Sequence, residues 1–146
     1  IATETGHYYV QVLDYMREMA HALNYVVEPA HDHVANKHKS LKKEQEKELT
    51  ELAEKISEVF NKTIHHVKEV NYTELDEIFT EMEELINHIQ EMRRQQIKRI
   101  KKGAVNTRNS MLYLGLMQES KNLLLFMINL LKAQRDFVIF TEKQLD

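Results

Sequence analysis

The sequence predicts an all-α fold, an antiparallel up-down-up-down bundle of about four long helices. Only 3 glycines and 1 proline occur among the 146 residues, so the chain has little of the turn chemistry that β-hairpins need. Leu, Glu, Lys, Met and Gln, which lose little side-chain freedom in a helix, are abundant. Apolar residues also recur at intervals of three and four in four successive stretches. A chain of this length fits one domain, and we assign residues 1–146 to a single helical bundle.

The first expected helix begins near residue 8 and carries one apolar face. That face consists of Tyr9, Val12, Met16, Met19, Leu23 and Val26. Pro29 interrupts the pattern, and we expect a kink there because proline lacks a backbone amide and clashes with the preceding turn. Further helical turns are expected to about His38, followed by a short polar connector at 38–43.

The second and third helices are both amphipathic. The second presents Leu49, Leu52, Ile56, Val59, Phe60, Thr63, Val67 and Val70. The third presents Leu75, Phe79, Met82, Ile86, Ile89, Ile97 and Ile100. Thr73 followed three residues later by Asp76 is typical of a helix start. A cationic last turn before Gly103 predicts the end of the third helix.

The fourth helix covers the most apolar stretch of the chain, residues 106–140, with Asn106 or Thr107 as its cap. Its apolar face is wider than a surface helix needs, so we expect the other helices to surround it. Asn129 and Lys132 break the run before it reaches the roughly 18 apolar residues of a membrane span. Because the connectors are short, neighbouring helices must run antiparallel.

Composition and charge argue against several classes of function. The chain has no cysteine, so disulfides and thiolate chemistry are excluded. The net charge of -3 and the pI near 6.3 provide no overall basic field, and we expect no nucleic-acid partner. No nucleophile with its base and no phosphate-binding glycine loop can be found in the sequence. The chain is therefore not expected to be an enzyme.

Six segments carry a family resemblance that covers nearly the whole chain. They are YYVQVLDY at 8–15, HVANKHK at 33–39, QIKRI at 96–100, TRNSMLYL at 107–114, ESKNL at 119–123 and LKAQRDF at 131–137. Together they resemble the PhoU-like C-terminal cytoplasmic domain of bacterial sodium/phosphate cotransporters.

This resemblance implies a regulatory helical bundle on the cytoplasmic side of the bacterial inner membrane. The domain would be excised from a longer chain whose upstream transmembrane transport domain is its partner. It would modulate phosphate transport by protein contact and meet the membrane only by proximity. A homodimer is left open.

The same resemblance raises an alternative, a stand-alone PhoU-type phosphate-uptake regulator that binds divalent or ferric metal through carboxylates. The family pairs carboxylates four residues apart on facing helices, and Glu77 and Glu81 keep that spacing. On the fourth helix the family has a glutamate followed four residues later by aspartate and histidine, but here Glu119 is followed by Leu123 and Leu124. Since the facing half-site is missing, we expect no cofactor.

A basic run near the end of the third helix predicts a second candidate site. Arg93, Arg94, Lys98 and Arg99 would share one pole of the bundle with the first connector and the start of the fourth helix. One interpretation is contact with an anion or an anionic lipid. The other is ordinary compensation of the helix dipole together with solubility.

Overall fold

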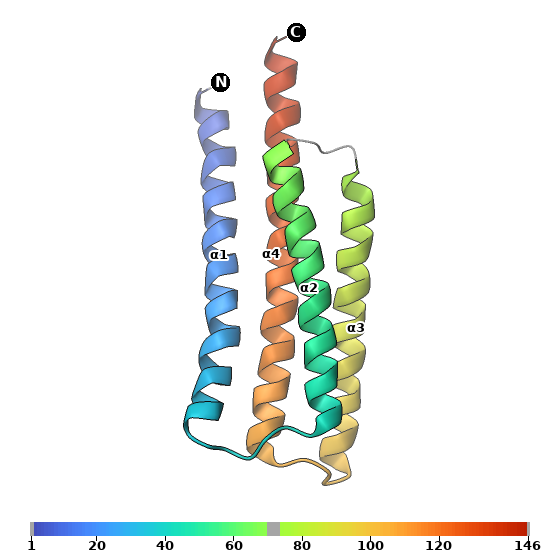
Figure 1. Ribbon diagram of the computed structural model, residues 1–146. Helices are drawn as coiled ribbons and strands as arrows, with labels where there is room; N and C mark the ends of the chain where they lie inside the picture. The colour runs from blue at the N-terminus through green and yellow to red at the C-terminus, as the bar shows by residue number, and fades with distance from the viewer. Residues whose placement is uncertain (1, 70–73, 146) are drawn as a thin grey trace.

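The computed structural model describes residues 2–69 and 74–145, and it shows four α-helices. They are α1 (Ala2–Ala35), α2 (Lys43–Glu69), α3 (Leu75–Lys101) and α4 (Thr107–Leu145). Successive helices run in opposite directions, so the chain goes up and down twice (Figure 1). The predicted all-α antiparallel bundle is confirmed.

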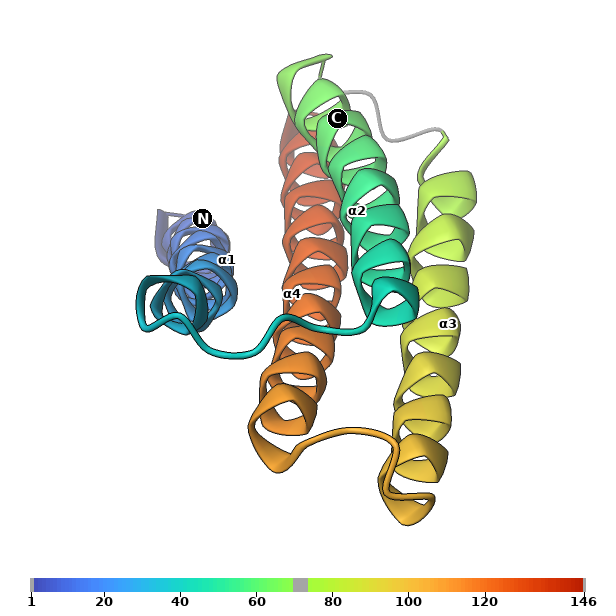
Figure 2. The same cartoon turned by 60° about the horizontal axis from the view of Figure 1, so that its bottom comes forward.

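α4 is the central helix of the bundle. It packs against each of the other three helices, and within the described residues α1 packs against α4 alone. Figure 2 shows α1 set apart from α2 and α3. The wide apolar face of α4 makes this possible, because it buries side chains toward all three neighbours: Leu116, Met117, Leu123, Leu124, Met127, Leu130 and Leu131.

α3 packs with a seven-residue repeat. Its buried residues are Leu75, Ile78, Met82, Leu85, Ile89, Met92 and Gln96. The predicted continuation through Ile97 and Ile100 is wrong, because these side chains are 46% and 43% exposed. A helix whose buried side chains keep facing the same neighbours follows a 3.5-residue period. Over the length of α3 this period places Gln96 in the core, whereas a 3.6-residue period would place Ile97 there.

Two helices end in the same hydrogen-bonded motif. After α3, the amide of Gly103 donates to Ile100 O and that of Ala104 to Arg99 O, both at 3.0 Å, with Gly103 at φ 65°. After α1, the amides of Lys37 and His38 donate to Val34 O and His33 O, with Lys37 at φ 52°. This pattern satisfies the last carbonyls of a helix and favours glycine at the left-handed position. The predicted stop at Gly103 is confirmed.

The helix starts agree only in part with the sequence patterns. Asn106 Oδ1 accepts a hydrogen bond from the amide of Asn109 at 2.8 Å, so the predicted cap of α4 is confirmed. The N-cap of α3 is Glu74, whose side chain makes no capping hydrogen bond. The predicted cap Thr73 lies outside the described residues.

α1 continues through Pro29 as one helix and ends at Ala35, before the expected end near His38. Pro29 is exposed, and its missing backbone amide leaves the carbonyl of Tyr25, four residues earlier, without its intrahelical donor. α1 is therefore one helix that includes Pro29 and packs against α4 (Figure 1).

Candidate functional site

The most unusual surface of the bundle is an exposed apolar stripe on α1, here called the outer stripe. It consists of Tyr9, Leu13, Met16, Leu23, Val27 and Val34, which are 41% to 76% exposed. When the small residues Ala20 and Ala30 are included, the residues of the stripe are alternately four and three positions apart. This pattern continues from residue 9 to residue 34, over more than three heptads. Such a repeat is the pattern with which one helix receives another.

A second apolar face of α1 packs on α4. Its residues each precede a residue of the outer stripe by one position in the sequence. Met19 and Ala22 on this inner face are buried, and Val12, Tyr15 and Val26 are half-buried. The sequence prediction for α1 mixed the two faces, because Val12 and Met19 are inner residues whereas Met16 and Leu23 are outer ones. α1 thus has two apolar faces and, among the described residues, one helical neighbour.

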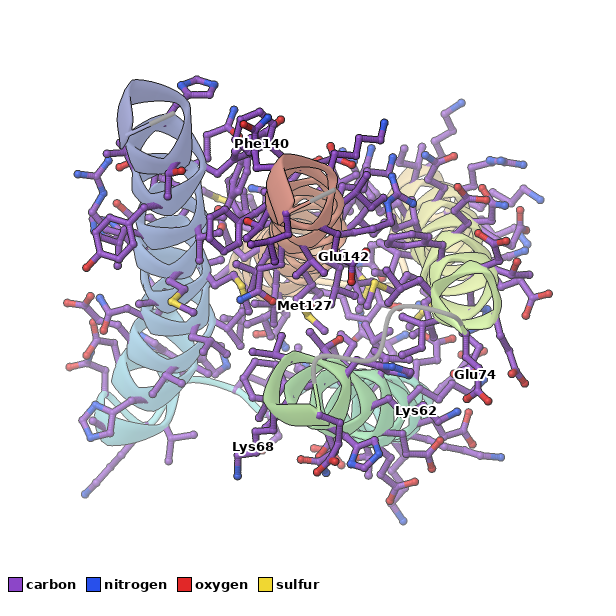
Figure 3. The ribbon with its side chains drawn as sticks, turned by 90° about the horizontal axis from the view of Figure 1, so that it is seen from above. Lys62, Lys68, Glu74, Met127, Phe140 and Glu142 are labelled. Carbon is purple, nitrogen blue, oxygen red and sulfur yellow. The ribbon has the colours of Figure 1, made fainter. Side chains whose placement is uncertain are left out.

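A pocket of ≈ 650 Å³ connects the outer stripe with α4. Tyr9 and Val12 line it from α1, and Gln134 and Phe137 line it from α4. The ring of Tyr8, which also lines the pocket, lies 6.2 Å from the ring of Phe137 and 5.8 Å from that of Phe140. Figure 3 shows Phe140 on the side of α4 that faces α1. The apolar surface of the outer stripe therefore extends onto the upper part of α4.

A buried polar network joins the other three helices at the opposite end of the bundle. Gln45 of α2 and Gln96 of α3 are fully buried, and Gln45 Nε2 donates to Gln96 Oε1 at 2.9 Å. Gln96 Nε2 in turn donates to Ser110 Oγ of α4 at 3.2 Å. Gln96 was missed in the sequence, although its place in the seven-residue repeat of α3 was a signal.

Arg99 and Glu48 extend this network with an ion pair. Arg99 Nη2 lies 2.6 Å from Glu48 Oε1, and Tyr113 of α4 donates its hydroxyl to Glu48 Oε2. Burial acts to raise the pKa of Glu48, but the hydrogen bonds from Arg99 and Tyr113 outweigh it and hold the pKa below its ordinary value. Burial and the hydrogen bond to Glu48 raise the pKa of Tyr113. The native state thus favours a neutral phenol beside a carboxylate.

Of the four basic residues singled out in the sequence, Arg99 does not lie on the exposed surface. Arg99 is only 14% exposed and is paired with Glu48 inside the bundle. Arg93 Nη1 donates to Gln118 Oε1 of α4 at 2.9 Å, and Arg94 lies 3.1 Å from a carboxylate oxygen of Glu91. Lys98 is exposed. Arg99 therefore connects α3 with α2 through its ion pair with Glu48 and is mostly shielded from solvent.

The predicted metal carboxylates lie at the opposite pole, beside α2. Both oxygens of Glu81 accept hydrogen bonds from Lys62 Nζ, at 2.7 and 2.9 Å, and Glu77 is exposed. Figure 3 shows Lys62 between α2 and α3. The hydrogen bond to Glu81 raises the pKa of Lys62. Across residues 2–69 and 74–145, no three His, Asp or Glu side chains are grouped closely enough to hold a metal ion.

Comparisons with known proteins add no assignment. No protein-family model, curated protein or solved structure matches the chain. Within the described part of the chain, none of the four helices combines the length and apolar character needed to span a membrane.

Proposed function

We propose that this chain is the regulatory domain of a sodium-dependent phosphate cotransporter and acts by contact with the transport domain of the same polypeptide. The domain would lie on the cytoplasmic side of a bacterial inner membrane. Two observations support the proposal: the six segments that resemble the PhoU-like domain of such transporters, and the outer stripe of α1. The outer stripe carries it, because it offers an apolar surface for a second protein element.

The dimensions of the outer stripe fit one helix. From Tyr9 to Val34 it runs about 37 Å, at 1.5 Å per residue, and with a helix width of about 10 Å it covers on the order of 400 Å². Separate partners in a stable complex bury about 800 Å² each. Elements of one polypeptide meet at high effective concentration, so a smaller surface suffices. The stripe therefore suits a tethered helix better than a second copy of this chain.

The way α1 is attached suggests how docking would regulate transport. Among the described residues α1 packs on α4 and not on α2 or α3, so a change in the position of α1 would act on the bundle through α4. A transport-domain helix on the outer stripe would favour one position of α1. If the two transport states bind the stripe unequally, docking changes their populations.

Site-specific crosslinking in the full-length polypeptide tests whether a transport-domain helix occupies the outer stripe. A photo-crosslinking residue in place of Leu23, on the outer stripe, is expected to react with a peptide of the transport domain. The matched control is His21, which is exposed on the same helix but outside the stripe. Crosslinks from Leu23 to a second copy of this chain, or equal yields at both positions, would contradict the proposal.

Transport measurements test the consequence. Leu23→Asp combined with Val27→Asp puts two charges into the proposed contact, which disfavours docking by about tenfold or more. Sodium-dependent phosphate uptake by the full-length protein in proteoliposomes should then differ from wild type, whereas His21→Asp should not change it. An unchanged rate in the double variant, at equal protein incorporation, would argue against regulation through α1.

A further inference from the structure

A hollow lies between the end of α1 and the start of α4, at the lower end of the bundle in Figure 1. It has a volume of ≈ 310 Å³. The charged and titratable residues that line it are Asp32 and His33 of α1, His38 of the connector between α1 and α2, and Arg108 of α4. Three of these four side chains are bases. The function proposed above uses none of them.

Two polar contacts join the connector to α4 in the described part of the chain. Asn109 Nδ2 donates a hydrogen bond to the carbonyl of Ser40 at 3.0 Å. Two residues earlier, the ring of His38 contacts the guanidinium of Arg108. Nη1 of Arg108 lies 2.5 Å from Nδ1 of the ring and 2.9 Å from Nε2. The contact between His38 and Arg108 is therefore one of two polar attachments that fix the connector to α4.

The contact with Arg108 requires His38 to be neutral. A guanidinium can only donate hydrogen bonds, so the ring of His38 must accept one. A neutral imidazole has one nitrogen without a proton that can accept, whereas both nitrogens of an imidazolium carry protons and can only donate. Protonation of His38 therefore removes the hydrogen bond and puts a second positive charge beside the guanidinium.

The groups around His38 oppose its protonation from both helices. Burial lowers the pKa of His38 below its ordinary 6.5, and the charges of Arg108 and His33 lower it further. The ring centroid of His33 lies 5.3 Å from that of His38. Arg108 belongs to the first turn of α4, where the helix dipole adds positive potential. Asp32, the carboxylate of the hollow, lies 3.5 Å from Nδ1 of His31, so it faces a different histidine.

His33 responds to acid differently from His38. Its Nε2 lies 2.9 Å from the carbonyl oxygen of Lys39. Because a carbonyl can only accept, this nitrogen carries a proton and donates it, and it does so whether the ring is neutral or charged. Acid therefore removes the hydrogen bond between the connector and Arg108 but keeps the one between the connector and the end of α1.

We propose that His38 and Arg108 form a proton-controlled link, which holds the connector on α4 at neutral pH and opens in mild acid. In the open form the proton is on His38, and the imidazolium and the guanidinium are both solvated. The open fraction rises below about pH 6.5, where a solvated histidine becomes protonated. The end of α1 is then attached to α4 more weakly than at neutral pH. The link does not depend on docking at the outer stripe.

An NMR titration of the isotopically labelled 146-residue chain between pH 8 and pH 5 tests the proposal. We expect the pKa of His38 to lie below 6.5. It should rise in Arg108→Met, which removes the charge and the donors but keeps a long side chain. The control Lys101→Met removes an exposed charge at the end of α3, outside the lining of the hollow, and should leave the pKa of His38 unchanged.

Nuclear Overhauser effects in the wild-type chain report the opening itself. Those between the ring of His38 and the side chain of Arg108 should be present at pH 7.5 and lost at pH 5.5. Those between the ring of His33 and Lys39 should remain at both pH values, which also shows that the end of α1 is still folded. A His38 pKa of 6.5 or above, an equal pKa in Arg108→Met and wild type, or His38–Arg108 effects that are absent at pH 7.5 or persist at pH 5.5 would each overturn the proposal.

Discussion

Arg99 of α3 and Glu48 of α2 form an ion pair with two contacts, inside the end of the bundle that carries the basic run of α3. Arg99 Nη2 lies 2.6 Å from Glu48 Oε1, and Nη1 lies 3.2 Å from Oε2. The hydroxyl of Tyr113 on α4 donates to the same carboxylate. One acidic side chain thus connects three helices, and a group that the sequence presents as a surface cation is part of the interior.

Removing the charge of Glu48 should destabilise the fold. Glu48→Gln leaves the mostly buried guanidinium of Arg99 without its main counter-ion, and we expect a loss of about 2 to 3 kcal/mol in the free energy of unfolding. Urea unfolding measures it. The control Glu46→Gln, at an exposed position in the first turn of α2, should change stability by less than about 0.5 kcal/mol. Equal effects of the two substitutions would show that the ion pair contributes little.

Stability should also fall in acid, and Glu48 should account for part of the loss. Its pKa is below the ordinary 4.5 in the native state, so its contribution is complete above pH 4.5 and disappears as the pH falls through the native pKa. The pKa of His38 is lowered by burial and by Arg108, which favours unfolding below pH 6.5. Thermal unfolding from pH 7 to 3 should show a shallower decline in Glu48→Gln than in wild type, and parallel curves would contradict this assignment.

The buried glutamines should behave as a coupled pair. Gln45→Leu or Gln96→Leu removes the hydrogen bond between the two amides and leaves one buried polar atom of the other amide unpaired, which should cost about 1 to 3 kcal/mol. The double variant removes both polar groups and should cost at least about 0.5 kcal/mol less than the sum. A double-mutant cycle from urea unfolding gives the coupling energy. Strict additivity would mean that the Gln45–Gln96 hydrogen bond does not contribute.

Lys37 occupies a position that suits glycine. Its φ of 52° is left-handed, which costs an L-residue about 1 kcal/mol, so Lys37→Gly should stabilise the protein by about that amount and raise Tm by about 2 to 4 °C. Lys37→Ala is the matched control, because it removes the same charge but keeps the backbone strain. If both variants stabilise equally, relief of charge repulsion at the basic pole is the cause.

The carboxylates Glu77 and Glu81 provide a test of the alternative function as a metal-binding regulator. Because both oxygens of Glu81 are engaged by Lys62, we expect protein purified without chelators to contain well under one metal ion per chain. Glu77→Ala with Glu81→Ala should leave that content unchanged. Elemental analysis of the purified protein measures the metal content. One metal ion per chain in wild type that is lost in the double variant would favour the metal-binding regulator.

Local patterns were enough to predict most of the fold. The four helices and their antiparallel order follow from apolar spacing and short connectors, and the cap at Asn106 and the stop at Gly103 follow from interactions within a few residues. Such signals are complete in the sequence because every group involved is a near neighbour along the chain. The end of α1 was harder to place, since a lysine, Lys37, occupies the left-handed position that is usually marked by a glycine.

Burial, by contrast, was decided by tertiary packing. α1 contains two apolar ladders one residue apart, and only the position of α4 determines that Met19 is covered while Leu23 is exposed. Arg99 is a typical cationic last-turn residue in the sequence, yet Glu48, 51 positions away, draws it inside. The contact between His38 and Arg108 likewise joins residues that are 70 positions apart. The sequence by itself determined where helices form, whereas the faces they hide and the charges they pair depend on which helices become neighbours.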